Sequence, residues 1–275
     1  MTEEDKYKTL IKKHHQLRDN WKQDNKPCII CGTNSANEGD HLPPKVLYPK
    51  SLRDSRTEFF KFPVCSECNR GSADADFLFS VLMCFSLNQP FYLKETSPID
   101  PDLLALDDQI KTQLNSEKEG KHRLDLLNPY SRQDPKTGKT TINTQKLPVN
   151  KTITKIVKSI YWLHTNGDIL QNYNPGWWIL PDIDTTRKNF VEKHLRSTNH
   201  DLQWENKFIS RYTMGLSENG CGGFISCSLH FYTKKKLGYG NNWLVIASPK
   251  ETKVEKKSLY DVCVSQFGSP TIYPK

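Results

Sequence analysis

Four of the eight cysteines form two Cys-x2-Cys pairs, Cys28 with Cys31 and Cys65 with Cys68. Each pair turns two thiolates toward one point, and two pairs supply the four ligands of a tetrahedral zinc site. The N-terminus has no apolar leader, so we expect a reducing compartment, where paired cysteines bind metal rather than form disulfides. The spacing therefore predicts a structural Zn²⁺ site, with disulfide or redox chemistry as the alternative.

Polar residues between and beside the cysteine pairs could form a second site. Asp40 and His41 lie between the pairs, and Asn69 directly follows the last cysteine. Carboxylate and amide oxygens suit Mg²⁺ or a similar hard cation, and imidazole is a base that works near neutral pH. A divalent cation with an imidazole is a minimal set for phosphodiester hydrolysis. If the zinc draws the two halves together, these three residues predict a hydrolytic site.

The order Cys-x2-Cys, Asp-His-x-Pro, Cys-x2-Cys-Asn resembles the HNH endonucleases, which have the ββα-metal fold. Over residues 27–80 the chain is similar to a bacterial, zinc-bearing branch of that family with an Asp-His-x-Pro-Pro-Lys core. The resemblance implies that Asp40 and Asn69 hold a catalytic Mg²⁺ or Mn²⁺ ion. It also implies that His41 is the general base and that the four cysteines hold the structural zinc.

One position departs from the family pattern. The family has an asparagine a few residues before the second cysteine pair, and here Glu58 occupies that position. A glutamate can accept a backbone N–H bond, as the asparagine usually does. The departure also motivates a hypothesis of another class, a zinc-stabilised nucleic-acid-binding module that does not cleave.

Other charged residues near the motif are supporting candidates. Lys45 and Arg70 could contact phosphates, although solvated surface charge is the ordinary role of such residues. Asp74 or Asp76 could complete the metal shell, although acids in a helix's first turn commonly serve the helix itself.

Hydrophobic periodicity predicts helices at several places along the chain. Residues 5–22 form an amphipathic pattern, with His14 and His15 expected on its solvated basic face and a phosphate contact as their alternative role. A buried helix should begin near Ser72, and another helix should begin at Pro101. A further helical pattern, from Ile153 to Tyr161, ends at Asn166-Gly167.

The remaining segments predict loops and strands. Residues 129–150 are short of apolar residues and should form a linker or long loop. Alternation over 224–232 and an apolar run over 242–248 predict strands of an antiparallel sheet. The four unpaired cysteines should be small buried hydrophobes.

The fold class expected is α+β, with an N-terminal ββα-metal HNH module and a C-terminal α+β domain that contains an antiparallel sheet. The predicted divisions are an N-terminal basic helix (1–26), the HNH zinc and nuclease module (27–90), a helical connector and linker (91–150), and the C-terminal domain (151–275).

The formal net charge of +8 is a mild basic bias that permits an anionic partner. Residues 1–80 contain 13 basic and 12 acidic residues, so nearly all the excess lies in the rest of the chain. We expect a metal-dependent endonuclease that acts on DNA, with RNA as an alternative substrate. In this enzyme the C-terminal part is expected to make much of the contact with the nucleic acid. A role as an antiphage defence effector, regulated by a protein or ligand at the C-terminal domain, is a further expectation. No apolar run is long enough for a membrane span, so a cytoplasmic location without membrane partners is expected; the oligomeric state stays open.

Overall fold

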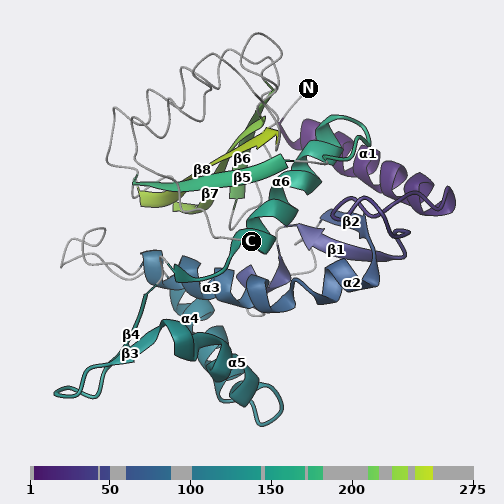
Figure 1. Ribbon diagram of the computed structural model, residues 1–275. Helices are drawn as coiled ribbons and strands as arrows, with labels where there is room; N and C mark the ends of the chain where they lie inside the picture. The colour runs from purple at the N-terminus through teal and green to yellow at the C-terminus, as the bar shows by residue number, and fades with distance from the viewer. Residues whose placement is uncertain are drawn as a thin grey trace.

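The computed structural model describes residues 3–42, 44–49, 60–87, 101–143, 146–170, 173–181, 210–216, 225–234 and 239–249. These residues form helices and small antiparallel sheets, which is compatible with the α+β class predicted from the sequence (Figure 1). Among the described residues, no helix has both the length and the apolar character needed to cross a bilayer.

The cysteine-rich part of the chain has a β-β-α order. After helix α1 (Glu3–Gln23), its elements are β1 (Glu38–Leu42), β2 (Phe60–Val64), α2 (Ser66–Arg70) and α3 (Ala73–Leu87). β1 and β2 pair antiparallel, with Asp40 opposite Phe62 and His41 opposite Lys61. This small arrangement, together with the four cysteines, fits a zinc-bearing HNH module in outline.

The apolar sequence of α3 explains its place in the fold. Every residue from Phe77 to Cys84 is buried, as predicted for a helix that is apolar nearly all round. Helix α1 matches the predicted helix over 5–22, and it packs against β2 through the buried side chain of His14. The expectation of a solvated His14 is therefore wrong, whereas His15 is exposed.

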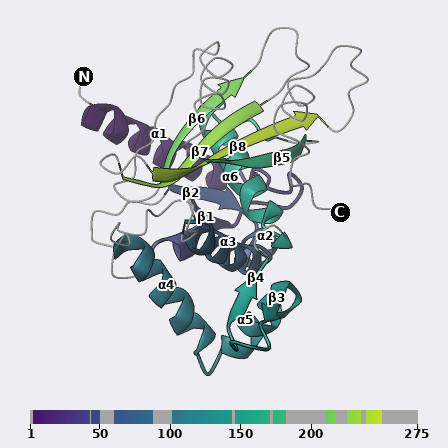
Figure 2. The same ribbon diagram turned by 90° about the vertical axis from the view of Figure 1, so that its left-hand side faces the viewer.

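The elements that follow form a separate group on the side of α3 away from the C-terminal sheet (Figures 1 and 2). They are α4 (Pro101–Leu114), α5 (Gly120–Leu127), the 3-10 turn η3 (Asn128–Tyr130), β3 (Ser131–Gln133) and β4 (Thr140–Ile142). The segment predicted as a loop over 129–150 thus contains a short hairpin. Local turn chemistry explains it, because the Asp134 carboxylate accepts bonds from Lys136 N and Thr137 Oγ1, and Gly138 has a φ of +66°.

Helix α6 (Asn150–His164) ends where the sequence predicts, because Asn166 and Gly167 both adopt positive φ. Its buried apolar residues belong to the same hydrophobic core as the β1–β2 hairpin and α3; they are Ile153, Ile156, Val157, Ile160, Trp162 and Leu163. The Trp162 ring meets Phe62 edge-on at 5.7 Å and Trp21 at 5.5 Å. The predicted division at residue 150 stays a prediction, but α6 itself packs with the N-terminal elements.

Beyond α6 the backbone forms a four-stranded antiparallel sheet in the order β5-β8-β7-β6. Its strands are β5 (Tyr173–Pro181), β6 (Ser210–Leu216), β7 (Ile225–Lys234) and β8 (Tyr239–Pro249). The sheet lies beside α6 (Figures 1 and 2), and β7 and β8 cover the two segments predicted as strands. Among the unpaired cysteines, Cys84 is buried, and the side chains of Cys221, Cys227 and Cys263 lie outside the described part of the chain.

Candidate metal centre and polar cleft

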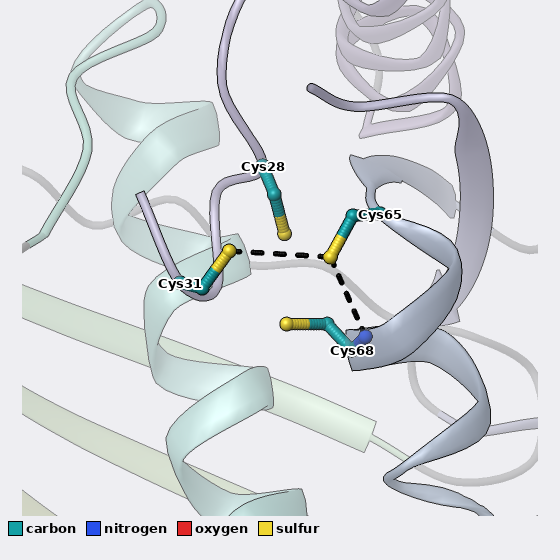
Figure 3. A group of neighbouring side chains, drawn as sticks. All are labelled: Cys28, Cys31, Cys65 and Cys68. Carbon is teal, nitrogen blue, oxygen red and sulfur yellow. Dashed lines mark hydrogen bonds between the residues drawn. The ribbon is translucent and has the colours of Figure 1, made fainter. Parts of the chain in front are cut away.

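The four paired cysteines converge at one point, as their spacing predicts (Figure 3). Their sulfur atoms all lie within 4.8 Å of one another, and Cys31 Sγ is 3.9 Å from Cys65 Sγ. A tetrahedral zinc with Zn–S bonds of about 2.3 Å needs sulfurs about 3.8 Å apart. The donor set therefore fits a metal ion and is consistent with structural zinc.

Local hydrogen bonds shape the two cysteine turns in the same way. In the first turn, Ile30 N donates to Cys28 Sγ at 3.4 Å, and Gly32 supplies the φ of +73° that closes the turn. In the second turn, Cys68 N donates to Cys65 Sγ, also at 3.4 Å. Backbone N–H groups directed at sulfur stabilise thiolates, so both turns are prepared for a cation.

A cleft of 640 Å³ with several polar side chains in its lining lies between the β-β-α elements and the α4–α5 pair. Asp40, His41 and Asn69 all line it. The opposite wall is fixed by two contacts between the groups of helices. Gln109 of α4 donates to the Val46 carbonyl at 2.7 Å, and Arg123 of α5 lies 3.2 Å from the Asp74 carboxylate. The three residues that predict a hydrolytic site thus lie together in one cleft.

Both oxygens of Asp40 are engaged within the protein. Oδ1 accepts the backbone N–H of His41 at 2.7 Å, and Oδ2 lies 2.8 Å from Lys155 Nζ. The same ammonium lies 2.5 Å from Asp76 Oδ2. Burial raises the pKa of Asp76, and the attraction of Lys155 opposes that rise. Asp40 is therefore held in a fixed orientation at the edge of the cleft.

Asn69 is oriented by Glu38. Its Nδ2 donates to Glu38 Oε2 at 2.6 Å, so the carbonyl oxygen Oδ1 is the atom that this side chain offers to a cation. Arg70 lies 3.7 Å from the other Glu38 oxygen and is exposed. With the Asp40 carboxylate in the same cleft, the donor chemistry fits a hard divalent cation.

His41 is half-buried, and its surroundings favour the neutral ring. Burial lowers its pKa to about 4, with further lowering by the nearby cations of Lys45 and Lys61. Asp40 opposes this lowering only in part. At neutral pH the imidazole is therefore unprotonated, and it is a weaker base than a free histidine ring.

The supporting candidates are placed differently. Lys45 lines the cleft, as a phosphate contact would require, whereas Arg70 is not among the lining residues. Asp74 bonds to His122 and Arg123 of α5, and Asp76, not Asp74, faces the cleft. Glu58 lies outside the described residues, so its role as a substitute for the family's asparagine stays a prediction.

Sequence reasoning missed two residues, Lys155 and Glu38, that hold the candidate site in shape. Lys155 lies on α6 in a buried polar stripe with Thr152 and Ser159, spaced as neighbours on one helix face. That spacing was visible in the sequence. However, nothing in it distinguishes buried Lys155 from exposed Lys151 on the same helix.

Comparison of the chain with protein-family models, with curated proteins and with solved structures found no match. The functional assignment therefore depends on the residues and geometry of the chain itself.

Proposed function

We propose that this protein is a metal-dependent endonuclease of the HNH type that hydrolyses phosphodiester bonds of DNA. The observation that carries the proposal is that Asp40, His41 and Asn69 line one cleft of a chain that also has a four-cysteine cluster. The order of these residues resembles the HNH motif, and the basic excess of the chain suits a polyanionic partner. RNA is the alternative substrate.

The roles follow from the chemistry of each side chain. His41, neutral at pH 7, takes a proton from the attacking water. Asp40 and the Asn69 carbonyl hold a divalent cation, which when bound neutralises the charge that develops on the phosphate. Lys45, exposed at the edge of the cleft, contributes positive charge where the nucleic-acid backbone would lie. The four cysteines fix the turns that position Asn69, because Asn69 directly follows Cys68.

One observation favours the second candidate, a nucleic-acid-binding module without catalysis. Asp40, the residue assigned as metal ligand, is already paired with the buried cation of Lys155. If that ammonium takes the place of the catalytic metal, the fold keeps its four-cysteine cluster and its net positive charge and loses hydrolysis. This candidate requires binding of nucleic acid with no cleavage under any divalent cation.

The wider role that we propose is that of a defence effector whose nuclease is controlled through the C-terminal part. The support is connectivity, since α6 carries Lys155 to Asp40 and is followed along the chain by β5 of the C-terminal sheet. A helix shared in this way could transmit binding of a ligand or protein at the sheet to the cleft.

A metal-titrated cleavage assay separates these functions. Zinc-loaded wild-type protein and the Asp40→Ala variant are incubated with labelled DNA and RNA across Mg²⁺ and Mn²⁺ concentrations. The nuclease proposal expects cation-dependent cleavage by the wild type and none by Asp40→Ala. Binding of nucleic acid without cleavage by either protein would instead support the non-catalytic module.

A further inference from the structure

Lys155 places a buried ammonium group directly behind the candidate metal site. Its side chain is only 3% exposed, and its Nζ contacts Asp40 Oδ2, Asp76 Oδ2 and, at 3.1 Å, Ser72 Oγ. The ammonium donates hydrogen bonds to Asp76 Oδ2 and Ser72 Oγ, and it forms an ion pair with Asp40 Oδ2. The buried charge is thus paired within the protein.

The network around this ammonium is fixed on each side. Thr152, one turn earlier on α6, donates to Asp76 Oδ1 at 2.8 Å. The second oxygen of Asp40 accepts the His41 backbone N–H. A buried charge is costly unless it is paired, and here one cation pairs with both carboxylates. Asp40 therefore cannot change its orientation without breaking a buried ion pair.

The same ammonium opposes a divalent cation at Asp40. A positive charge within hydrogen-bonding distance of a ligand oxygen repels a metal ion bound to that oxygen, most strongly where water is excluded. It also neutralises Asp76, a second carboxylate that lines the cleft. Without the ammonium, two carboxylates would face one another beside the site, a strong attraction for a hard cation.

We propose that Lys155 is a positioning residue of the cleft that fixes Asp40 in its orientation and keeps the affinity for a free divalent cation low. This role rests on the proposed function, because it takes Asp40 as a metal ligand. It predicts opposite effects of losing Lys155, namely tighter binding of the cation and slower cleavage. A residue with a purely structural role would not tighten metal binding.

The test is the affinity of the zinc-loaded, full-length protein for Mn²⁺, measured by electron paramagnetic resonance of the free ion. Lys155→Met removes the charge while keeping much of the side-chain volume, and Lys151→Met removes the same charge from an exposed position on the same helix. We expect Lys155→Met to bind Mn²⁺ at least about tenfold more tightly than wild type and Lys151→Met to match wild type. Unchanged or weaker binding by Lys155→Met overturns the inference.

Two further measurements keep the test decisive. If Lys155→Met does not fold, as judged by circular dichroism and zinc content, Lys155→Gln carries the same expectation, because its amide still donates to a carboxylate. Cleavage is measured in parallel on the same proteins. Tighter Mn²⁺ binding without cleavage by the wild type supports the role of Lys155 and refutes the nuclease. Cleavage by the wild type with no change in Mn²⁺ affinity in Lys155→Met refutes the role of Lys155 alone.

Discussion

Mild acid is expected to destabilise this fold through His14, which joins α1 to β2. The ring is fully buried, and its Nε2 lies 3.1 Å from the backbone nitrogen of Lys61 and 2.9 Å from its carbonyl oxygen. Phe60 and Phe62 meet it edge-on, each at 4.8 Å between ring centroids. Burial in this aromatic setting lowers the pKa of His14 from its ordinary 6.5 to about 3.

The sign of the effect follows from the two pKa values. The unfolded chain takes up a proton at His14 below pH 6.5, whereas the folded chain does so only near pH 3. Stability is therefore fully present above pH 6.5 and is lost as the pH falls through the range between the two values. From about pH 7.5 to about pH 5.5, the free energy of unfolding should fall by about 1.4 kcal/mol through this residue alone.

The assay is urea denaturation of wild type and His14→Leu at both pH values. His14→Leu starts less stable, because it loses the contacts with the Lys61 backbone, but its ring no longer titrates. The remaining titrating groups, including the zinc cysteines, are common to both proteins and cancel in the comparison. The wild type should lose about 1.4 kcal/mol more than the variant over this range. Equal losses in the two proteins would refute the buried, neutral state of His14.

Two other predictions test the cysteine cluster and the end of α6. Cys65→Ser should lose bound zinc, measured as metal content, and should unfold at a lower temperature than wild type. Cys84→Ala, which changes a cysteine outside the cluster, should retain its zinc. Retention of zinc by Cys65→Ser would contradict the four-cysteine site. Gly167→Ala should lower the free energy of unfolding by about 2 kcal/mol, because the φ of Gly167 is +119° and a Cβ there would lie 2.9 Å from the Trp21 ring. Gly138 has a φ of +66° and open space around it, so Gly138→Ala should lower the free energy of unfolding by about 1 kcal/mol. Equal losses in the two variants, measured by urea denaturation, would argue against the contact with Trp21.

The parts of the fold that local chemistry decides were predictable from the sequence. The cysteine spacing predicted the cluster, because two Cys-x2-Cys turns need only come together to complete it. Apolar periodicity predicted α1, α3 and α6, and Asn166-Gly167 predicted the end of α6, since both residues tolerate positive φ.

Features that depend on tertiary partners were not predictable in this way. His14 lies among lysines in the sequence, and only the packing of α1 on β2 shows that its ring is buried. Lys155 resembles its exposed neighbour Lys151 until the carboxylates of Asp40 and Asp76 are brought to it from distant elements. The choice between Asp74 and Asp76 likewise depended on tertiary partners, because His122 and Arg123 of α5 bind Asp74 whereas Lys155 of α6 binds Asp76.

The most direct test of the proposed function is the rate at which zinc-loaded protein nicks supercoiled plasmid with Mn²⁺. His41→Ala is compared with His122→Ala, which removes an exposed imidazole that does not line the cleft. The proposed role of His41 predicts nicking by the wild type and by His122→Ala, and a rate at least about a hundredfold lower for His41→Ala. Nicking by His41→Ala at the wild-type rate would contradict it.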